Sequence, residues 1–96
     1  MVKVMPNRAV VDANIKNIEK TNESNIFQAS IEILSSEPVE GYADFANRFV
    51  GKIIEAKLFA PEGHSIGLNK PVKLIIRYEG DERGGAFFAQ QQTEMN

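Results

Sequence analysis

A run of charged side chains in the stretch RYEGDERGGAFF, residues 77–88, could form a metal loop, a phosphate loop or the turn of a hairpin. A calcium loop needs oxygen ligands at alternate positions, whereas Asp81 and Glu82 are adjacent and point apart in an extended chain. A phosphate loop needs glycines at the start of a helix, whereas Gly84 and Gly85 lead into AFFAQ, which reads as a strand. A hairpin turn explains every feature, because glycines adopt positive φ at little cost and the acidic side chains stay in solvent. We therefore predict a β-hairpin and no metal site.

The chain offers little material for nucleophilic catalysis. It has no cysteine, which excludes disulfides, thiolate metal sites and cysteine nucleophiles. Its one histidine, His64, precedes Ser65 in a loop, and neighbours in sequence rarely adopt the geometry of a catalytic pair. No nucleophile elbow is present. We expect a protein that is not an enzyme, has no catalytic residues and requires no cofactor.

Basic and aromatic side chains on predicted strands support a binding role instead. Phe87 and Phe88 are consecutive, so in a strand they point to opposite faces and only one of them enters the core. An exposed ring among basic residues on a sheet is typical of proteins that hold single-stranded nucleic acid by stacking and phosphate neutralisation. We expect the cations to contact phosphates and Tyr78 or Phe88 to stack on bases. The predicted ligand-binding residues are Lys57, Lys73, Arg77, Tyr78, Arg83 and Phe88.

The size and charge of the chain limit these functions. Its 96 residues, 43% of them hydrophobic, predict a single domain over 1–96 with short flexible ends at about 1–7 and 92–96. The net charge of −2 argues against a globally basic surface. Residues 1–40 hold four basic and six acidic side chains, whereas residues 41–96 hold seven of each, so a local basic face in the second part stays open. No signal peptide or run of about 18 apolar residues is seen, and we expect a cytoplasmic protein without membrane contacts.

Three stretches show the two-residue alternation of half-buried strands, and a fourth is predicted to return as the last strand after the hairpin turn. Residues 11–18 alternate with one slip near Asn17, which a β-bulge explains. Residues 26–33 show the cleanest alternation, and the polar segment EKTNESN before them predicts a hairpin. Residues 71–79 and 86–92 are two further predicted strands.

Residues 42–59 fit two patterns. Apolar pairs recur at four-residue steps and would form one stripe on a helix over 43–58. Gly51 lies within that stripe and costs about 1 kcal/mol relative to alanine in a helix. The second solution is a short helix or turn over 43–49, followed by a strand over 52–60. Periodicity does not decide between them, because the apolar pairs satisfy both templates.

The strand solution gives five short strands, which can close into a small barrel without exposed edges. The arrangement FVGKIIEAKLFA … GLNKPVKLIIRYEGDERGGAFFAQ resembles the second half of oligonucleotide/oligosaccharide-binding (OB) barrels: a glycine-led strand, a loop, a strand and a glycine-containing hairpin. The likeness covers roughly residues 10–91 and departs from that family at PEGHSIGLN, where most members carry a helix. We predict a mostly β fold, a five-stranded OB-like barrel. The alternative is an α+β domain, with two hairpins and one helix packed across the sheet.

The expected function follows from this face and this resemblance. We expect a non-catalytic binding module whose ligand is single-stranded nucleic acid. The alternative is a protein–protein interaction or assembly subunit, homodimeric through exposed strand edges or through the face that carries Phe88.

Overall fold

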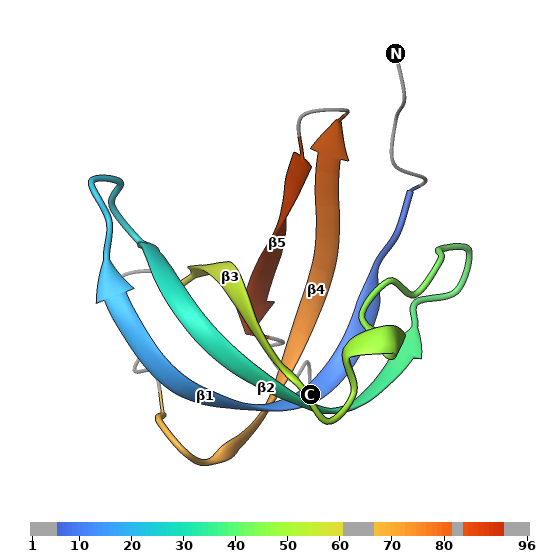
Figure 1. Cartoon of the computed structure of the whole chain (residues 1–96), viewed down its shortest axis with the longest axis horizontal. Helices are drawn as coiled ribbons and strands as arrows, with labels where there is room; N and C mark the ends of the chain where they lie inside the picture. The colour runs from blue at the N-terminus through green and yellow to red at the C-terminus, as the bar shows by residue number, and fades with distance from the viewer. Residues whose placement is uncertain (1–5, 61–66, 82–83, 92–96) are drawn as a thin grey trace, which may run out of the picture.

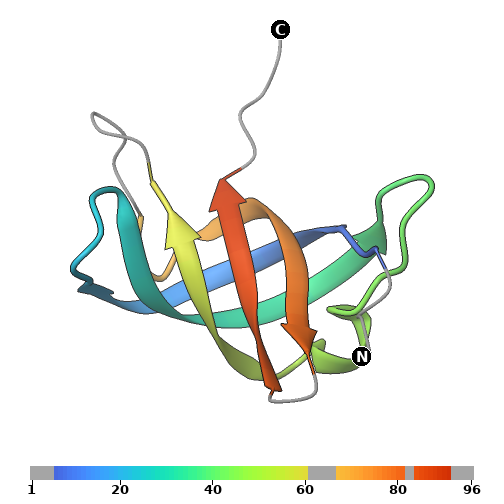
Figure 2. The same cartoon turned by 90° about the horizontal axis from the view of Figure 1, so that it is seen from above.

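The computed structural model describes residues 6–60, 67–81 and 84–91. Its five strands form a closed barrel in the order β1-β2-β3-β5-β4 (Figures 1 and 2). Neighbouring strands are antiparallel, except that β3 and β5 are parallel. The elements are β1 (Ala9–Lys20), β2 (Ile26–Pro38), the 3₁₀ turn η1 (Asn47–Phe49), β3 (Ile53–Phe59), β4 (Pro71–Asp81) and β5 (Gly84–Gln91). The predicted mostly β, five-stranded barrel is confirmed.

The alternative of a helix over 43–58 is wrong. The chain makes only the 3₁₀ turn η1 there and then enters β3, because Gly51 adopts a φ of +85° that ends any right-handed turn. The Gly51 amide donates to the carbonyl of Ile33 over 2.7 Å, and the Ile33 amide donates to the carbonyl of Lys52 over 3.0 Å. These bonds start the pairing of β3 with β2, so Ile54 and Leu58 of the apolar stripe lie on the inner face of a strand.

The barrel closes with the help of a long β1 and two bulges in its ladder with β2, one at Leu34 of β2 and one at Lys16 of β1. Register shifts relative to β2 occur between Asp12 and Ala13 and between Ile15 and Asn17, and the second is the slip predicted from the sequence. Bulges bend a strand and increase its twist. As a result β1 pairs with β2 along its length and with β4 over residues 9–14 (Figure 2).

The inner faces of all five strands supply one core. Period-two alternation places buried side chains at every second position, as in Val11, Ala13 and Ile15 of β1. The largest fully buried side chains are Val11, Ile31, Ile33, Leu58, Leu74 and Ile76. The radius of gyration of 13.0 Å is that expected for a compact domain of about 100 residues. Among the residues that the structure describes, no helix is long and apolar enough to span a membrane.

The stretch 77–88 forms the predicted hairpin, with β4 and β5 paired as far as Asp81 and Gly84. Gly84 has a φ of +123°, as a turn glycine should. Gly85 is a glycine for a different reason: a Cβ there would lie 2.5 Å from the Tyr78 hydroxyl oxygen and from the Glu79 carbonyl oxygen. The tyrosine therefore packs directly over the hairpin backbone. Two parts of the sequence analysis, the predicted contact residue Arg83 and His64 with its loop, lie outside the described residues.

Candidate functional site

Three of the six predicted contact residues meet on the outer surface of the barrel. Phe88 of β5 lies opposite Lys57 of β3 on one side and opposite Arg77 of β4 on the other. The Lys57 Nζ is 5.7 Å and the Arg77 Cζ 5.0 Å from the centroid of the Phe88 ring, so both cations make cation–π contacts. We call these three side chains the Phe88 platform.

The alternation of β5 keeps the Phe88 ring on the outside. Phe87 points inward, is 9% exposed, and makes edge-to-face contacts with Phe49 at 5.3 Å and Tyr78 at 5.0 Å between ring centroids. Phe88 then has to point outward, where it is partly exposed and the two cations flank it. The barrel thus holds an aromatic ring at its surface by burying the neighbouring one.

The two cations of the platform differ in their partners. The Arg77 Nε donates to Glu79, and both side chains are about half exposed. Exposed ion pairs of this kind contribute about 0–1 kcal/mol, so Glu79 competes only weakly with a phosphate for the guanidinium. Lys57 has no carboxylate within 4.0 Å among the described residues. The platform therefore offers one free ammonium group and one guanidinium that an anion can recruit.

Lys73 lies on the same outer face of β4 but apart from the platform. It is four positions before Arg77, which is about 13 Å along a strand. The Lys73 Nζ is 3.4 Å from Asp12 Oδ1, and Asp12 Oδ2 also accepts a hydrogen bond from Ser35 Oγ. The structure thus places Lys73 beside a carboxylate that offsets its charge.

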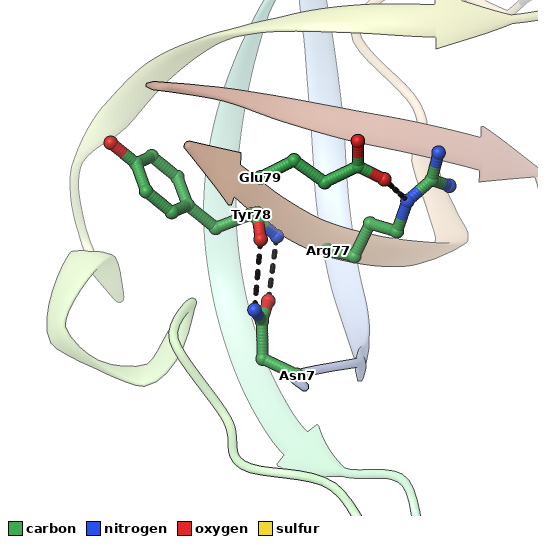
Figure 3. A network of polar contacts seen from close by, with 4 residues as sticks. All are labelled: Asn7, Arg77, Tyr78 and Glu79. Atoms are coloured by element: carbon green, nitrogen blue, oxygen red, sulfur yellow. Dashed lines mark hydrogen bonds and ion pairs between the residues drawn. The ribbon is translucent and has the colours of Figure 1, made fainter. Parts of the chain in front are cut away.

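Tyr78 lies on the other side of β4, facing the end of the barrel. Its backbone amide donates to Asn7 Oδ1 over 2.6 Å, and Asn7 Nδ2 donates to its carbonyl over 2.8 Å (Figure 3). Its ring stacks on Phe45 at 6.2 Å and, with Phe49, Phe87 and Arg48, lines a hollow of about 240 Å³. Tyr78 therefore does not share a surface with Phe88. Asn7, at the boundary of the predicted flexible start, is 8% exposed.

Two further residues join the neighbourhood of the platform that the sequence did not single out. Arg8 and Arg77 line one small hollow together with Ile75 and Gln90. The Arg8 guanidinium also lies over the ring of Tyr42, 5.1 Å from its centroid. Arg8 precedes β1 and Tyr42 lies in a turn, so no strand periodicity marked either of them. Only the pairing of segments far apart in the chain brings them to this face.

Metal chemistry finds no support in the described part of the chain, where no three acidic or histidine side chains gather around one point. Comparison of the chain with models of protein families, with curated proteins and with solved structures found no match. The function is therefore argued from the geometry of the barrel surface.

Proposed function

We propose that the protein is a non-catalytic binding module of the OB type that holds single-stranded nucleic acid on the Phe88 platform. The proposal rests mainly on an aromatic ring that lies between two cations on the outer surface of three adjacent strands. Every base has a π-face that can stack on Phe88, while Lys57 and Arg77 neutralise phosphates. Such contacts distinguish single strands from duplexes, whose bases are already stacked, and they read little sequence.

Two features of the fold support the OB assignment within this proposal. Five strands close into a barrel, and a long, bulged first strand pairs with both β2 and β4. OB barrels commonly bind along the surface of their second and third strands. Here that surface carries Glu32 and Glu55, which makes it unsuited to phosphates. The ligand path is therefore displaced toward Phe88 of β5, which Lys57 of β3 and Arg77 of β4 flank.

The magnitudes predict weak, salt-sensitive binding. Stacking of one base on an aromatic side chain contributes about 1–3 kcal/mol, and each cation that contacts a phosphate releases counterions. With a net charge of −2, the protein has no long-range attraction for a polyanion. The affinity depends on local contacts and falls as salt rises.

A titration of a fluorescently labelled oligothymidine, followed by anisotropy at several salt concentrations, tests the proposal. We expect binding at low salt that weakens with added salt, and a further loss in Lys57→Ala. Lys52→Ala is the matched control, because it removes the same charge just before β3, five residues away. Absence of any association at low salt and high micromolar protein would sink the proposal.

A second candidate function, self-association, is favoured by an apolar group elsewhere on the surface. Leu34, Val50 and Ile53 are 41%, 42% and 59% exposed. The bonds of Ile33 with Gly51 and Lys52 place this segment beside Leu34. Light scattering after size exclusion tests the idea: a dimer that Ile53→Lys converts to a monomer supports it, and a wild-type monomer at high micromolar concentration refutes it.

A further inference from the structure

We propose that Arg8 and Arg77 form a seat for one phosphate group of the bound strand, and that Tyr42 supplies a second stacking ring beyond it. This inference rests on the proposed function and extends the ligand path across the seam between β4 and β1. The resulting row along the outer surface has two rings and three cations, in the order Lys57, Phe88, Arg77, Arg8 and Tyr42.

The register of the β1–β4 seam places the two arginines opposite each other. Ala9 pairs with Ile76, and the side-chain amide of Asn7 binds both backbone polar groups of Tyr78 (Figure 3). Arg8, between them, therefore lies across from Arg77. Asn7 and Ala9 are 8% and 1% exposed and face inward, so alternation turns the Arg8 side chain outward.

The space between the arginines matches a small anion. Arg8, Ile75, Arg77 and Gln90 line a hollow of about 60 Å³, which is the volume of about two water molecules in the liquid. A phosphate fits this size and can accept paired N–H bonds from each planar guanidinium. Arg8 has no carboxylate partner among the described residues, so its charge remains available. A hollow lined by two arginines complements an anion and no cation.

Backbone hydrogen bonds hold the far end of the row in place. The Arg8 amide donates to the carbonyl of Ala43, and its own carbonyl accepts from the amide of Val39, both over 3.0 Å. The Tyr42 amide donates to the carbonyl of Val39 over 2.9 Å. The turn that presents Tyr42 is thereby bonded to the residue whose guanidinium lies on its ring. Tyr42 is 40% exposed, which leaves ring surface free for a base.

The distances along the row suit a strand rather than a single nucleotide. Neighbouring strands of a sheet lie about 4.8 Å apart, so Phe88 and Arg8, two strands apart, are separated by about 10 Å. A base on Phe88 and a base on Tyr42 then flank the phosphate held between the arginines. The path runs across the strands, from β3 through β5 and β4 to the start of β1.

Anisotropy titrations of oligothymidine with Arg8→Ala and Tyr42→Ala test the seat. Arg8→Ala should lower the slope of log affinity against log salt by about 1, because one phosphate contact is lost. Tyr42→Ala should weaken binding by about fivefold to a hundredfold at an unchanged salt slope, because a stacking ring and no charge is removed. Arg48→Ala is the control, since this exposed arginine lies in η1 at the barrel end and should change neither quantity.

The outcomes separate the seat from the proposed function. If Arg8→Ala and Tyr42→Ala bind like the wild type while Lys57→Ala and Phe88→Ala lose affinity, the function stands and the extended path is wrong. If the wild type binds no oligonucleotide, both proposals fall as they are stated. Melting temperatures close to that of the wild type would show that losses do not reflect unfolding, as expected for two partly or fully exposed side chains.

A second measurement identifies the source of the phosphate. The Nε–H signals of Arg8 and Arg77 in NMR spectra should shift on addition of oligothymidine, and should not shift with an uncharged methylphosphonate analogue of the same bases. Shifts with pyrophosphate but none with oligothymidine would contradict the strand model and assign the seat to a free anion. Shifts with neither anion would overturn the seat itself.

Discussion

At the scale of single residues, the surface position of Phe88 is the feature with the most consequence. Phe88 is partly exposed on the outer face of the barrel, with a cation on each of its two sides. Lys57 and Arg77 shield the ring from water and keep positive charge beside it. When a base takes the place of one of these cations on the ring, the displaced cation can contact the adjoining phosphate.

Replacement of Phe88 tests this role. Phe88→Ala should weaken oligothymidine binding by about 1–3 kcal/mol, because one stacking contact is removed. Phe88→Trp should retain or increase affinity, because the larger ring preserves the stack. Anisotropy titrations at one low salt concentration measure both. Equal binding by the wild type and Phe88→Ala would show that the ring takes no part in recognition.

Glu79 provides a test in the opposite direction. Its carboxylate accepts from Arg77 Nε in the free protein and adds negative charge near the ligand path. Glu79→Gln should therefore strengthen oligonucleotide binding by a few-fold, since a competing exposed ion pair is worth about 0–1 kcal/mol. Glu23→Gln removes the same charge in the turn between β1 and β2, away from Arg77 and Lys57, and is the matched control. Weaker binding by Glu79→Gln would mean that the ion pair orients Arg77 for the ligand.

At the scale of elements, the β4–β5 hairpin positions the platform on one side and the aromatic barrel end on the other. Arg77 and Phe88 point outward, while Tyr78 and Phe87 point toward the core. The tyrosine ring lies close over Gly85, where a side chain has no room. The hairpin thus depends on a glycine to seat Tyr78, and its register sets which side chains face the ligand.

Substitution of this glycine measures that dependence. Gly85→Ala should destabilise the protein by about 1–3 kcal/mol, as overpacking does, because the new Cβ would lie 2.5 Å from Tyr78 and Glu79 oxygen atoms. Gly67→Ala is the control: its Cβ would meet only Lys70 Cδ at 3.8 Å, and we expect a change within about 0.5 kcal/mol. Urea unfolding followed by circular dichroism gives both values. Equal stabilities would show that the hairpin rearranges freely.

At the scale of the whole molecule, one closed barrel supports every feature of the surface. All five strands contribute to a single buried cluster, so the strands that carry the platform share their core with those that carry the proposed seat. Loss of any part of the cluster should therefore loosen the whole barrel. Binding residues on the outside can be changed with little effect on that core.

A core truncation tests this cooperativity. Ile31 is fully buried between β1 and β3, and Ile31→Ala should cost about 2–5 kcal/mol. Unfolding should stay a single transition at a lower midpoint, as in small domains generally. Leu68→Ala, at a residue 44% exposed, should change stability by no more than about 0.5 kcal/mol. Two separate transitions would contradict the single core.

The strands were readable from the sequence because alternation is a local property. In β1, β2 and β4 every second side chain is apolar, and a half-buried strand is the structure that places all of them on one face. The consecutive Phe87 and Phe88 likewise require one exposed ring in a strand of any barrel. The slip near Asn17 could be predicted for the same reason, since a bulge changes the spacing between successive apolar residues of the strand.

Only the tertiary structure decided the features that depend on which segments meet. The segment around Gly51 satisfied both helix and strand until its pairing with Ile33 selected the strand. No sequence pattern around Arg8 or Tyr42 predicted a role in binding. They join the ligand path because the β1–β4 register sets Arg8 opposite Arg77. Alternation determines which face a side chain occupies, whereas its neighbours across the sheet are fixed by ladders between residues distant in the chain.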